Sequence, residues 1–187
     1  MGICSSKKDT LSELALKSNI NVCVTDKNYH QDIEKIKLID PTKIPYFNWK
    51  GKIFYARPCN IYDGDTFSIC WVWKGDIIKY RCRCLGYDSP EMKPRKVTQE
   101  TPDKSLQVLN ANRDKEKEMA KAAKERFEQL LNANSSGLIK VECDDFDKYG
   151  RILVIVWNGI ETKSINQIML DEGHGRPYLG GTKESWS

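Results

Sequence analysis

The chain has 187 residues, of which 40% are hydrophobic and 30% are charged, with a formal net charge of +4. This length is enough for one well-packed domain with a tail, and it is short for two. The longest apolar run, Ile152 to Trp157, is too short to cross a bilayer, which argues against a membrane-embedded protein. The excess positive charge permits a polyanionic partner without requiring one. No apolar signal-peptide segment opens the chain, so we expect a cytoplasmic protein.

The first six residues, M-G-I-C-S-S, match the pattern for N-myristoylation at Gly2. Cys4 is placed for palmitoylation, and two lysines follow. One myristoyl chain holds a protein only marginally, so a second acyl chain and nearby basic charge are needed for stable anchoring. The alternative is an unmodified terminus that merely begins with glycine. We expect residues 1–50 to form a leader with an acyl anchor and a spacer, on the cytoplasmic face of a membrane.

Within this leader, apolar spacing indicates short helices near residues 11–15 and 33–37, which prolines then end. The aromatic residues that follow are expected to pack on the main domain: Tyr46, Phe47 and Trp49. The seven cysteines predict small buried thiols in a reducing compartment, with a disulfide framework as the alternative. No C-x-x-C pair with partner histidines supports a zinc site.

From Gly51 onward the pattern changes to strands. Alternation, aromatic and β-branched residues, and turn signals between the segments predict five of them, at 52–62, 66–73, 77–85, 139–143 and 151–157. Helical spacing predicts a short helix over 164–172 and a long one over 111–131, whose apolar stripe is Met119, Ala123, Phe127, Leu130 and Leu131. Residues 92–110 are typical of an exposed loop and the last fifteen residues of coil. This order predicts an α+β domain over 51–180, a small, partly open barrel capped by helices, with a tail at 181–187.

Two carboxylates, Asp63 and Asp65, flank one glycine just before a predicted strand. Strand alternation would place both side chains on one side of the chain. Two like charges that close repel each other unless a cation lies between them. Oxygen ligands of this kind favour Ca²⁺, Mg²⁺ or Mn²⁺ over zinc. The alternative is an ordinary Asp-Gly turn.

A second acidic group, Asp88-Ser89-Pro90-Glu91, ends a later strand. The proline restricts Ser89 to an extended conformation, which would aim its carbonyl at a metal. Glu91 is a candidate general base for an attacking water. The alternative is the capped N-terminus of a helix.

Arg83 and Arg151 each lie on a predicted strand or at its margin. A lone arginine there commonly covers apolar surface or pairs with a carboxylate. The functional alternative is stabilisation of a phosphoryl transition state, because a guanidinium binds two phosphate oxygens at once. The two histidines, His30 and His174, lie in no comparable group of side chains.

Three motifs occur in order, Y-D-G-D-T, R-x-x-x-x-D-S-P-E and D-K-Y-G-R, with a helix between the last two. This set, within residues 51–180, resembles the staphylococcal nuclease (thermonuclease-like) family. The resemblance implies a five-stranded Greek-key OB-fold barrel with capping helices. It also implies an enzyme that binds one Ca²⁺ ion and hydrolyses DNA and RNA, preferring single strands and leaving 3′-phosphate ends.

The resemblance further implies a role for each site residue. Asp65 and Asp88 would bind the metal with the Ser89 carbonyl, and Asp63 would lie close by. Glu91 would be the general base, and Arg83 and Arg151 would hold the phosphate. The nucleotide would contact Lys148, Tyr149 and Tyr178, although the match at Tyr178 slips by one residue.

Two features depart from the secreted bacterial members of that family. The segment from Met92 to about Asn112 is longer than their active-site loop, which leaves the substrate preference open. The acylatable N-terminus instead resembles the lipid-anchored plant Ca²⁺-dependent nucleases of the family. An alternative function is a membrane-tethered OB-fold module that binds nucleic acid or protein without cutting it. We favour the enzyme because all six candidate catalytic and metal residues are present.

Overall fold

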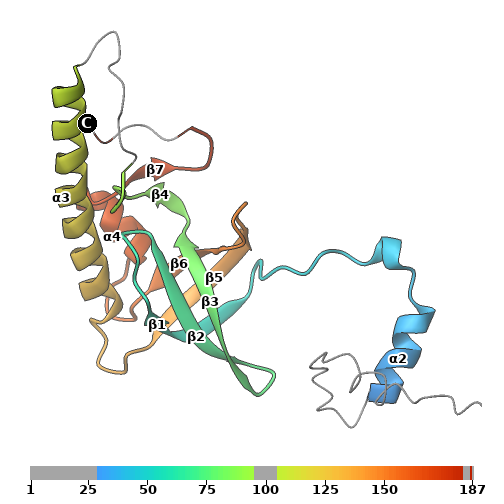
Figure 1. The fold of residues 1–187 in the computed structure, drawn as a ribbon. Coiled ribbons are helices and arrows are strands. Elements are labelled where there is room, and N and C mark those ends of the chain that lie inside the picture. The colour runs from blue at the N-terminus through green and yellow to red at the C-terminus, as the bar shows by residue number, and fades with distance from the viewer. Residues whose placement is uncertain (1–28, 95–104, 183–185, 187) are drawn as a thin grey trace, which may run out of the picture. The chain divides into compact units, whose positions relative to one another are not determined.

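The computed structural model describes residues 29–94, 105–182 and 186 (Figure 1). The expected acylation sites, Gly2 and Cys4, and the expected helix near residues 11–15 lie outside this part of the chain. The chain divides into two compact units, Met1–Tyr46 and Phe47–Ser187. Among the described helices, none is long and apolar enough to cross a membrane.

The described part of the first unit contains helix α2 (Tyr29–Leu38) and the 3₁₀ turn η1 (Pro41–Lys43). The helix includes the short helical segment expected near residues 33–37. Asp40 caps η1, because its Oδ1 accepts the N–H of Thr42 at 3.0 Å.

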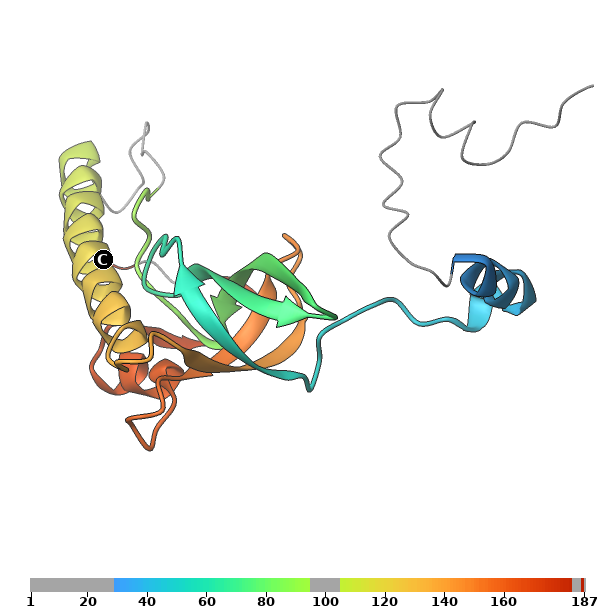
Figure 2. The ribbon, with the colours of Figure 1, turned by 90° about the horizontal axis from the view of Figure 1, so that it is seen from below.

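The second unit is built on a closed five-stranded barrel (Figures 1 and 2). Its strands run in the order β1-β2-β3-β6-β5, and β1 pairs with β5 to close it. Only the β3–β6 pair among these is parallel. The bounds are β1 Ile53–Cys59, β2 Thr66–Trp73, β3 Asp76–Cys84, β5 Ile139–Phe146 and β6 Ile152–Trp157. The predicted α+β OB-fold barrel is confirmed. The strand pattern predicted a partly open barrel, whereas the observed barrel is closed.

The barrel is filled by the side chains that alternate inward along each strand. On β5 the buried residues are Ile139, Val141 and Cys143, as their alternation with charged residues predicts. The five described cysteines are free thiols, and Cys82 and Cys84 are buried. Cys82, Cys84 and Cys143 serve as small hydrophobic core residues, as predicted, whereas Cys59 and Cys70 are only partly buried.

The long helix α3 (Leu106–Leu131) covers one side of the barrel (Figure 1), and Phe127 meets Phe67 edge-on at 5.3 Å. It begins five residues before the predicted start because Ser105 caps it, with Oγ accepting the N–H of Val108. The predicted stripe is wrong at Met119, which is 38% exposed, while Ala120 is buried. The short helix α4 (Ile165–Asp171) lies within its predicted range.

A second, two-stranded sheet pairs β4 (Gly86–Asp88) with β7 (Arg176–Tyr178). In this antiparallel pair Asp88 lies opposite Arg176, and Gly86 lies opposite Tyr178. The coil predicted for the last fifteen residues is therefore wrong at β7. Strands of three residues carry too little alternation to be recognised, and this pairing joins segments about ninety residues apart.

An aromatic cluster closes the end of the barrel where the second unit begins. Trp49 is buried and meets Phe54, Trp71 and Trp73 at ring distances of 5.3, 5.5 and 4.8 Å. Phe47 contacts Trp49 edge-on, as expected. Tyr46 ends the first unit and is 98% exposed.

Candidate active site

The Asp63-Gly64-Asp65 segment is a tight turn that leads into β2. Asp63 Oδ1 accepts the backbone N–H groups of Asp65 and Thr66 at 3.1 and 2.8 Å. One oxygen of Asp63 therefore holds the turn together, as Asp side chains do in Asx turns. The prediction that strand alternation sets the two aspartates side by side is wrong, since both precede β2. The turn places them near each other instead.

The carboxylate of Asp65 contacts three different segments of the chain. It is 2% exposed, and its Oδ1 accepts the hydroxyl of Thr66 at 2.7 Å. Its Oδ2 accepts the backbone N–H of Ser89 at 3.2 Å and pairs with Arg83 Nη1 at 2.8 Å. Asp65 thus joins the start of β2 to the end of β3 and to the segment after β4.

Arg83 lies between two buried carboxylates. Its Nη1 pairs with Asp65, and its Nη2 pairs with Asp88 Oδ1 at 2.8 Å and donates to the Tyr87 carbonyl at 3.3 Å. Of the readings open from the sequence, the structure shows the pairing with a carboxylate rather than the covering of apolar surface. A guanidinium has five N–H donors, so these three contacts leave donors for a further anion.

The site carries an excess of buried negative charge. Burial and, next, the charge of Asp65 raise the pKa of Asp63 to about 7. Glu91 adds to this effect, which places its carboxylate near the group. Burial disfavours the charged form of Arg83, but Asp65 and Asp88 outweigh it and raise the pKa of this guanidinium. Three buried aspartates, Asp63, Asp65 and Asp88, therefore lie around Arg83, which is the one buried arginine among the residues that the structure describes.

The donor atoms of this group suit a hard divalent cation. The possible metal ligands are all oxygen atoms, which such ions prefer. One of them, the Ser89 hydroxyl, is buried without a hydrogen-bond partner in the structure. A cation would also offset the repulsion that raises the Asp63 pKa. In the described ranges, no three acidic, histidine or cysteine side chains converge to hold an ion by themselves. The residues present fit an ion held by two carboxylates, with backbone oxygen and water completing the coordination.

Helix α3 holds the segment that carries Glu91. The backbone N–H of Glu91 donates to Glu116 Oε1 at 3.2 Å, and Arg113 Nε donates to the Pro94 carbonyl at 3.3 Å. No local pattern marks Glu116 or Arg113 in the sequence, because their role depends on where α3 packs.

Arg151 joins the same hydrogen-bonded group from the other side. Its Nε pairs with Asp147 Oδ2 at 2.7 Å, and its Nη1 donates to Thr66 Oγ1 at 3.1 Å. Since Thr66 Oγ1 in turn donates to Asp65, a chain of contacts links Arg151 to Asp65. Thr66 lies opposite Arg83 in the β2–β3 ladder. Sequence reasoning missed Thr66, although it is the last residue of the D-G-D-T motif.

The three residues predicted to contact nucleotide lie beside the two arginines. The Tyr149 ring is exposed and lies 5.4 Å from Arg151 Cζ and 5.1 Å from Lys148 Nζ. The Tyr178 ring lies 5.6 Å from Arg83 Cζ. The β4–β7 pairing brings Tyr178 there. Every site residue predicted within the second unit is therefore gathered in one place.

Close packing beneath the turn fixes its position. A Cβ at Gly64 would meet Ala123 Cβ at 2.9 Å and Ser89 Cβ at 3.0 Å, so only glycine fits between α3 and the acidic segment. The Tyr87 hydroxyl donates to the Gly64 carbonyl at 2.6 Å. Gly175 lies against the Tyr87 ring, where any side chain would overlap it.

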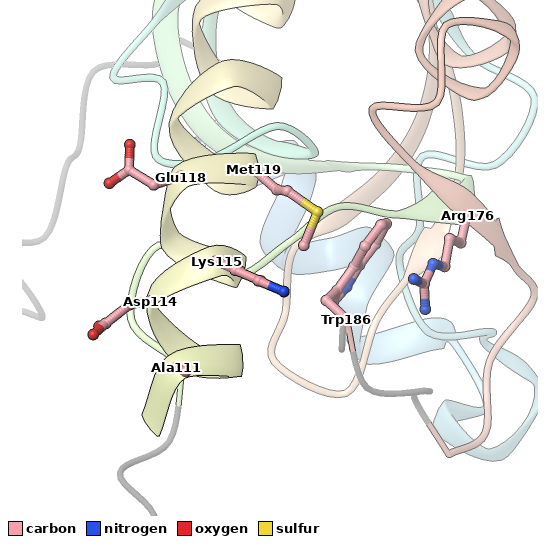
Figure 3. Close-up of a pocket in the computed structure, with 7 residues that line it drawn as sticks. All are labelled: Ala111, Asp114, Lys115, Glu118, Met119, Arg176 and Trp186. Carbon is pink, nitrogen blue, oxygen red and sulfur yellow. The ribbon is translucent and has the colours of Figure 1, made fainter. Parts of the chain in front are cut away.

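A pocket of about 790 Å³ lies between α3, Arg176 of β7 and Trp186 (Figure 3). Its lining is Ala111, Asp114, Lys115, Glu118, Met119, Arg176 and Trp186. Figure 3 shows Met119 and Lys115 pointing toward Trp186, and Asp114 and Glu118 pointing away from it. The Arg176 guanidinium lies 4.1 Å from the Trp186 ring. Arg176 also lines a smaller cavity of about 180 Å³ that reaches Asp88, so open space borders the acidic group.

A comparison with known protein families matches residues 81–184 to the family described as staphylococcal nuclease homologue. A comparison with curated proteins found no match. The match begins at Arg81, so Asp63 and Asp65 lie outside it, and the structure brings them to Arg83 and Asp88 inside it. The matched residues make up more than half of the chain, and the barrel agrees with them. The chain belongs to the staphylococcal nuclease homologue family.

Proposed function

We propose that the protein is a Ca²⁺-dependent nuclease that hydrolyses phosphodiester bonds of DNA and RNA, preferably in single strands. One observation carries the proposal. Arg83 joins Asp65 to Asp88, and Thr66 joins Asp65 to the half-buried Arg151, in one connected group beside Glu91. Acids and arginines held together in this way suit an anionic substrate that needs both a base and charge neutralisation.

Asp65 and Asp88, with the Ser89 carbonyl and with Asp63 nearby, would hold the Ca²⁺ ion. The bound ion would supply electrophilic activation of the phosphate and lower the pKa of water. Thr66 and the backbone N–H of Ser89 keep the Asp65 carboxylate in one orientation.

A carboxylate oxygen of Glu91 accepts the proton of the water that attacks the phosphorus in line. The contact between the Glu91 backbone and Glu116 positions this base. Arg151 and the remaining N–H groups of Arg83 donate to the phosphate oxygens as their negative charge grows. The leaving group is the 5′ oxygen, so the products carry 3′-phosphates.

The Tyr149 and Tyr178 rings, which lie beside these arginines, contact the nucleotide, and Lys148 contacts a terminal phosphate. An aromatic ring accepts any base, and such contacts favour an unpaired strand over a duplex. This arrangement supports the preference for single-stranded substrate.

We further propose that Gly2 and Cys4 are acylated and hold the enzyme on the cytoplasmic face of a membrane. The support is the pattern of the first eight residues. Mass spectrometry of the protein from eukaryotic cells should find a myristoyl group that Gly2→Ala removes. An unmodified N-terminal glycine in the original protein would contradict it.

The nuclease is tested with labelled single-stranded DNA, in Ca²⁺ and in EGTA, using the full chain and Glu91→Gln. We expect cutting only with Ca²⁺, and Glu91→Gln should bind but lose on the order of 10²- to 10⁴-fold in turnover. Glu125→Gln, at an exposed position on α3, is the matched control and should cut normally. Binding without cutting in any divalent ion would instead favour the non-catalytic module, and full activity of Glu91→Gln would reject the assigned base.

A further inference from the structure

Three strands of the barrel share a basic outer face that the active site does not use. It consists of Arg57 on β1 and of Lys79 and Arg81 on β3, all exposed, and we call it the basic face. Cys70 of β2 lies opposite Arg57 on one side and opposite Lys79 on the other, so these residues form one row across three strands. Arg81 lies in the next row, opposite Ser68.

The charge of this face is not neutralised by neighbours. None of its three side chains forms an ion pair with a carboxylate in the described part of the chain, and β2 between them has no charged residue. Elsewhere in the same unit Lys50, Arg126 and Lys163 pair with carboxylates at 3.0, 2.7 and 2.6 Å. Unpaired positive charge gathered on one surface attracts a polyanion.

The basic face continues directly from the active site. Arg83 follows Arg81 by two residues on β3 and therefore points to the same side of the sheet. Lys79 lies about 13 Å from Arg83 along the strand, since each residue advances a strand by about 3.3 Å. Figure 1 shows β1, β2 and β3 side by side, with β4 leading on from β3. A nucleic-acid strand that enters the site at Arg83 can therefore follow β3 outward.

Exposed apolar side chains flank the basic face at its far end. Tyr55, Val72 and Ile77 are 72%, 65% and 78% exposed, and Val72 lies opposite Ile77. Tyr55 precedes Arg57 by two residues, so its ring lies on the same side of β1. Basic side chains next to an exposed aromatic ring are the elements with which proteins bind a single strand.

We propose that the basic face binds the phosphodiester backbone of a single-stranded nucleic acid beyond the scissile bond. Arg57, Lys79 and Arg81 contact successive phosphates, and Tyr55 stacks on a base. These contacts raise affinity for long strands without reading their sequence. The inference rests on the proposed nuclease function, because the strand is the one that enters the active site.

The first test measures the binding of oligothymidylate by fluorescence anisotropy at several salt concentrations. The oligonucleotide has about 15 nucleotides, which is close to the largest number that one OB fold binds. Full-length Glu91→Gln protein is compared with the same protein carrying Arg57→Gln, Lys79→Gln and Arg81→Gln. The control carries Lys121→Gln, Lys124→Gln and Lys163→Gln and loses the same charge. Each phosphate contact with a single strand contributes about 0.7 to the slope of log affinity against log salt concentration. The basic-face variant, which loses three contacts, should therefore lower the magnitude of this slope by about 2 and the affinity by about tenfold or more. The control should keep both.

The second test measures cleavage of a dinucleotide and of the same long strand by otherwise unchanged protein. The basic-face substitutions should leave dinucleotide cleavage unchanged and raise KM for the long strand. Equal losses in the basic-face variant and its control, or none in either, would overturn the inference. The inference would also be overturned if the basic-face variant lost binding to phosphatidylserine vesicles but kept oligonucleotide binding. That result would show that the basic face binds a membrane. If wild-type protein binds the strand but cuts neither substrate, the proposed nuclease activity is rejected. The binding test then still shows whether the basic face contacts the strand.

Discussion

Arg83 and Asp65 form a buried ion pair, with 2.8 Å between Nη1 and Oδ2. Both side chains lie almost entirely out of solvent, and Arg83 pairs with Asp88 as well. Removing one partner of a buried pair leaves the other charge without compensation, which costs far more than the net stabilisation by the pair. This relationship makes the candidate active site a structural element of the fold as well.

Arg83→Ala should lower the free energy of unfolding by roughly 3–5 kcal/mol, because Asp65 and Asp88 stay buried without their cation. Urea denaturation in EGTA measures this loss. Arg81→Ala is the control, since Arg81 is exposed on the same strand and should change stability by less than about 0.5 kcal/mol. Similar small losses in both variants would show that the Arg83 pairs contribute little.

Calcium should stabilise the folded protein because it would offset the repulsion among Asp63, Asp65 and Asp88. At a Ca²⁺ concentration 100 times its Kd, mass action adds about 2.7 kcal/mol. Thermal unfolding should show a higher Tm with Ca²⁺, and Asp65→Asn should abolish the increase. Asp171→Asn, which alters an exposed pair with Lys163, should keep it. An unchanged Tm of the original protein in millimolar Ca²⁺ would count against the metal site.

Gly64→Ala should destabilise the protein by about 1–3 kcal/mol, because the new methyl group overlaps Ala123 and Ser89. It should also reduce cleavage, since the overlap pushes the Asp65 turn away from the Ser89 segment. The double variant with Ala123→Gly removes the closest contact, so part of the stability should return beyond the sum of the single effects. A purely additive double variant would show that Ala123 does not limit the space at Gly64.

Asp147→Asn should lower stability by about 1 kcal/mol near neutral pH, because its ion pair with Arg151 is lost while the amide oxygen still accepts the backbone N–H groups. Burial raises the pKa of Asp147, but hydrogen bonds from the backbone and side chain of Arg151 and from the Tyr149 backbone outweigh it and lower the pKa below 3.8.

The lowered pKa sets the direction of the pH effect. A carboxyl group with a lower pKa when folded contributes stability above its unfolded pKa and loses it as pH falls through the folded value. The stability difference between the original protein and Asp147→Asn should therefore be constant near neutrality and shrink below about pH 4. Urea denaturation at several pH values measures it, with exposed Asp145→Asn as control. A difference that grows in acid would contradict the assignment.

The amino-acid sequence by itself determined the elements with a strong local pattern. The barrel strands either alternate or, at β6, form a continuous apolar run, and α3 carries a long helical stripe, so each was recognised without its neighbours. The three motifs also identified the acids and arginines, because their residue types and order are local properties of the chain. Where the pattern was short or depended on a cap, as at β7 and at the start of α3, the prediction failed.

Only the tertiary structure decided how these residues meet. The pairing of β4 with β7 sets Tyr178 beside Arg83, and the packing of α3 brings Glu116 to the Glu91 backbone. Arg83 could equally have covered apolar surface until its two buried carboxylates were seen around it. The row of Arg57, Cys70 and Lys79 exists only through strand register. Contacts between segments far apart in sequence arise from packing and pairing in three dimensions, and no local residue pattern encodes them.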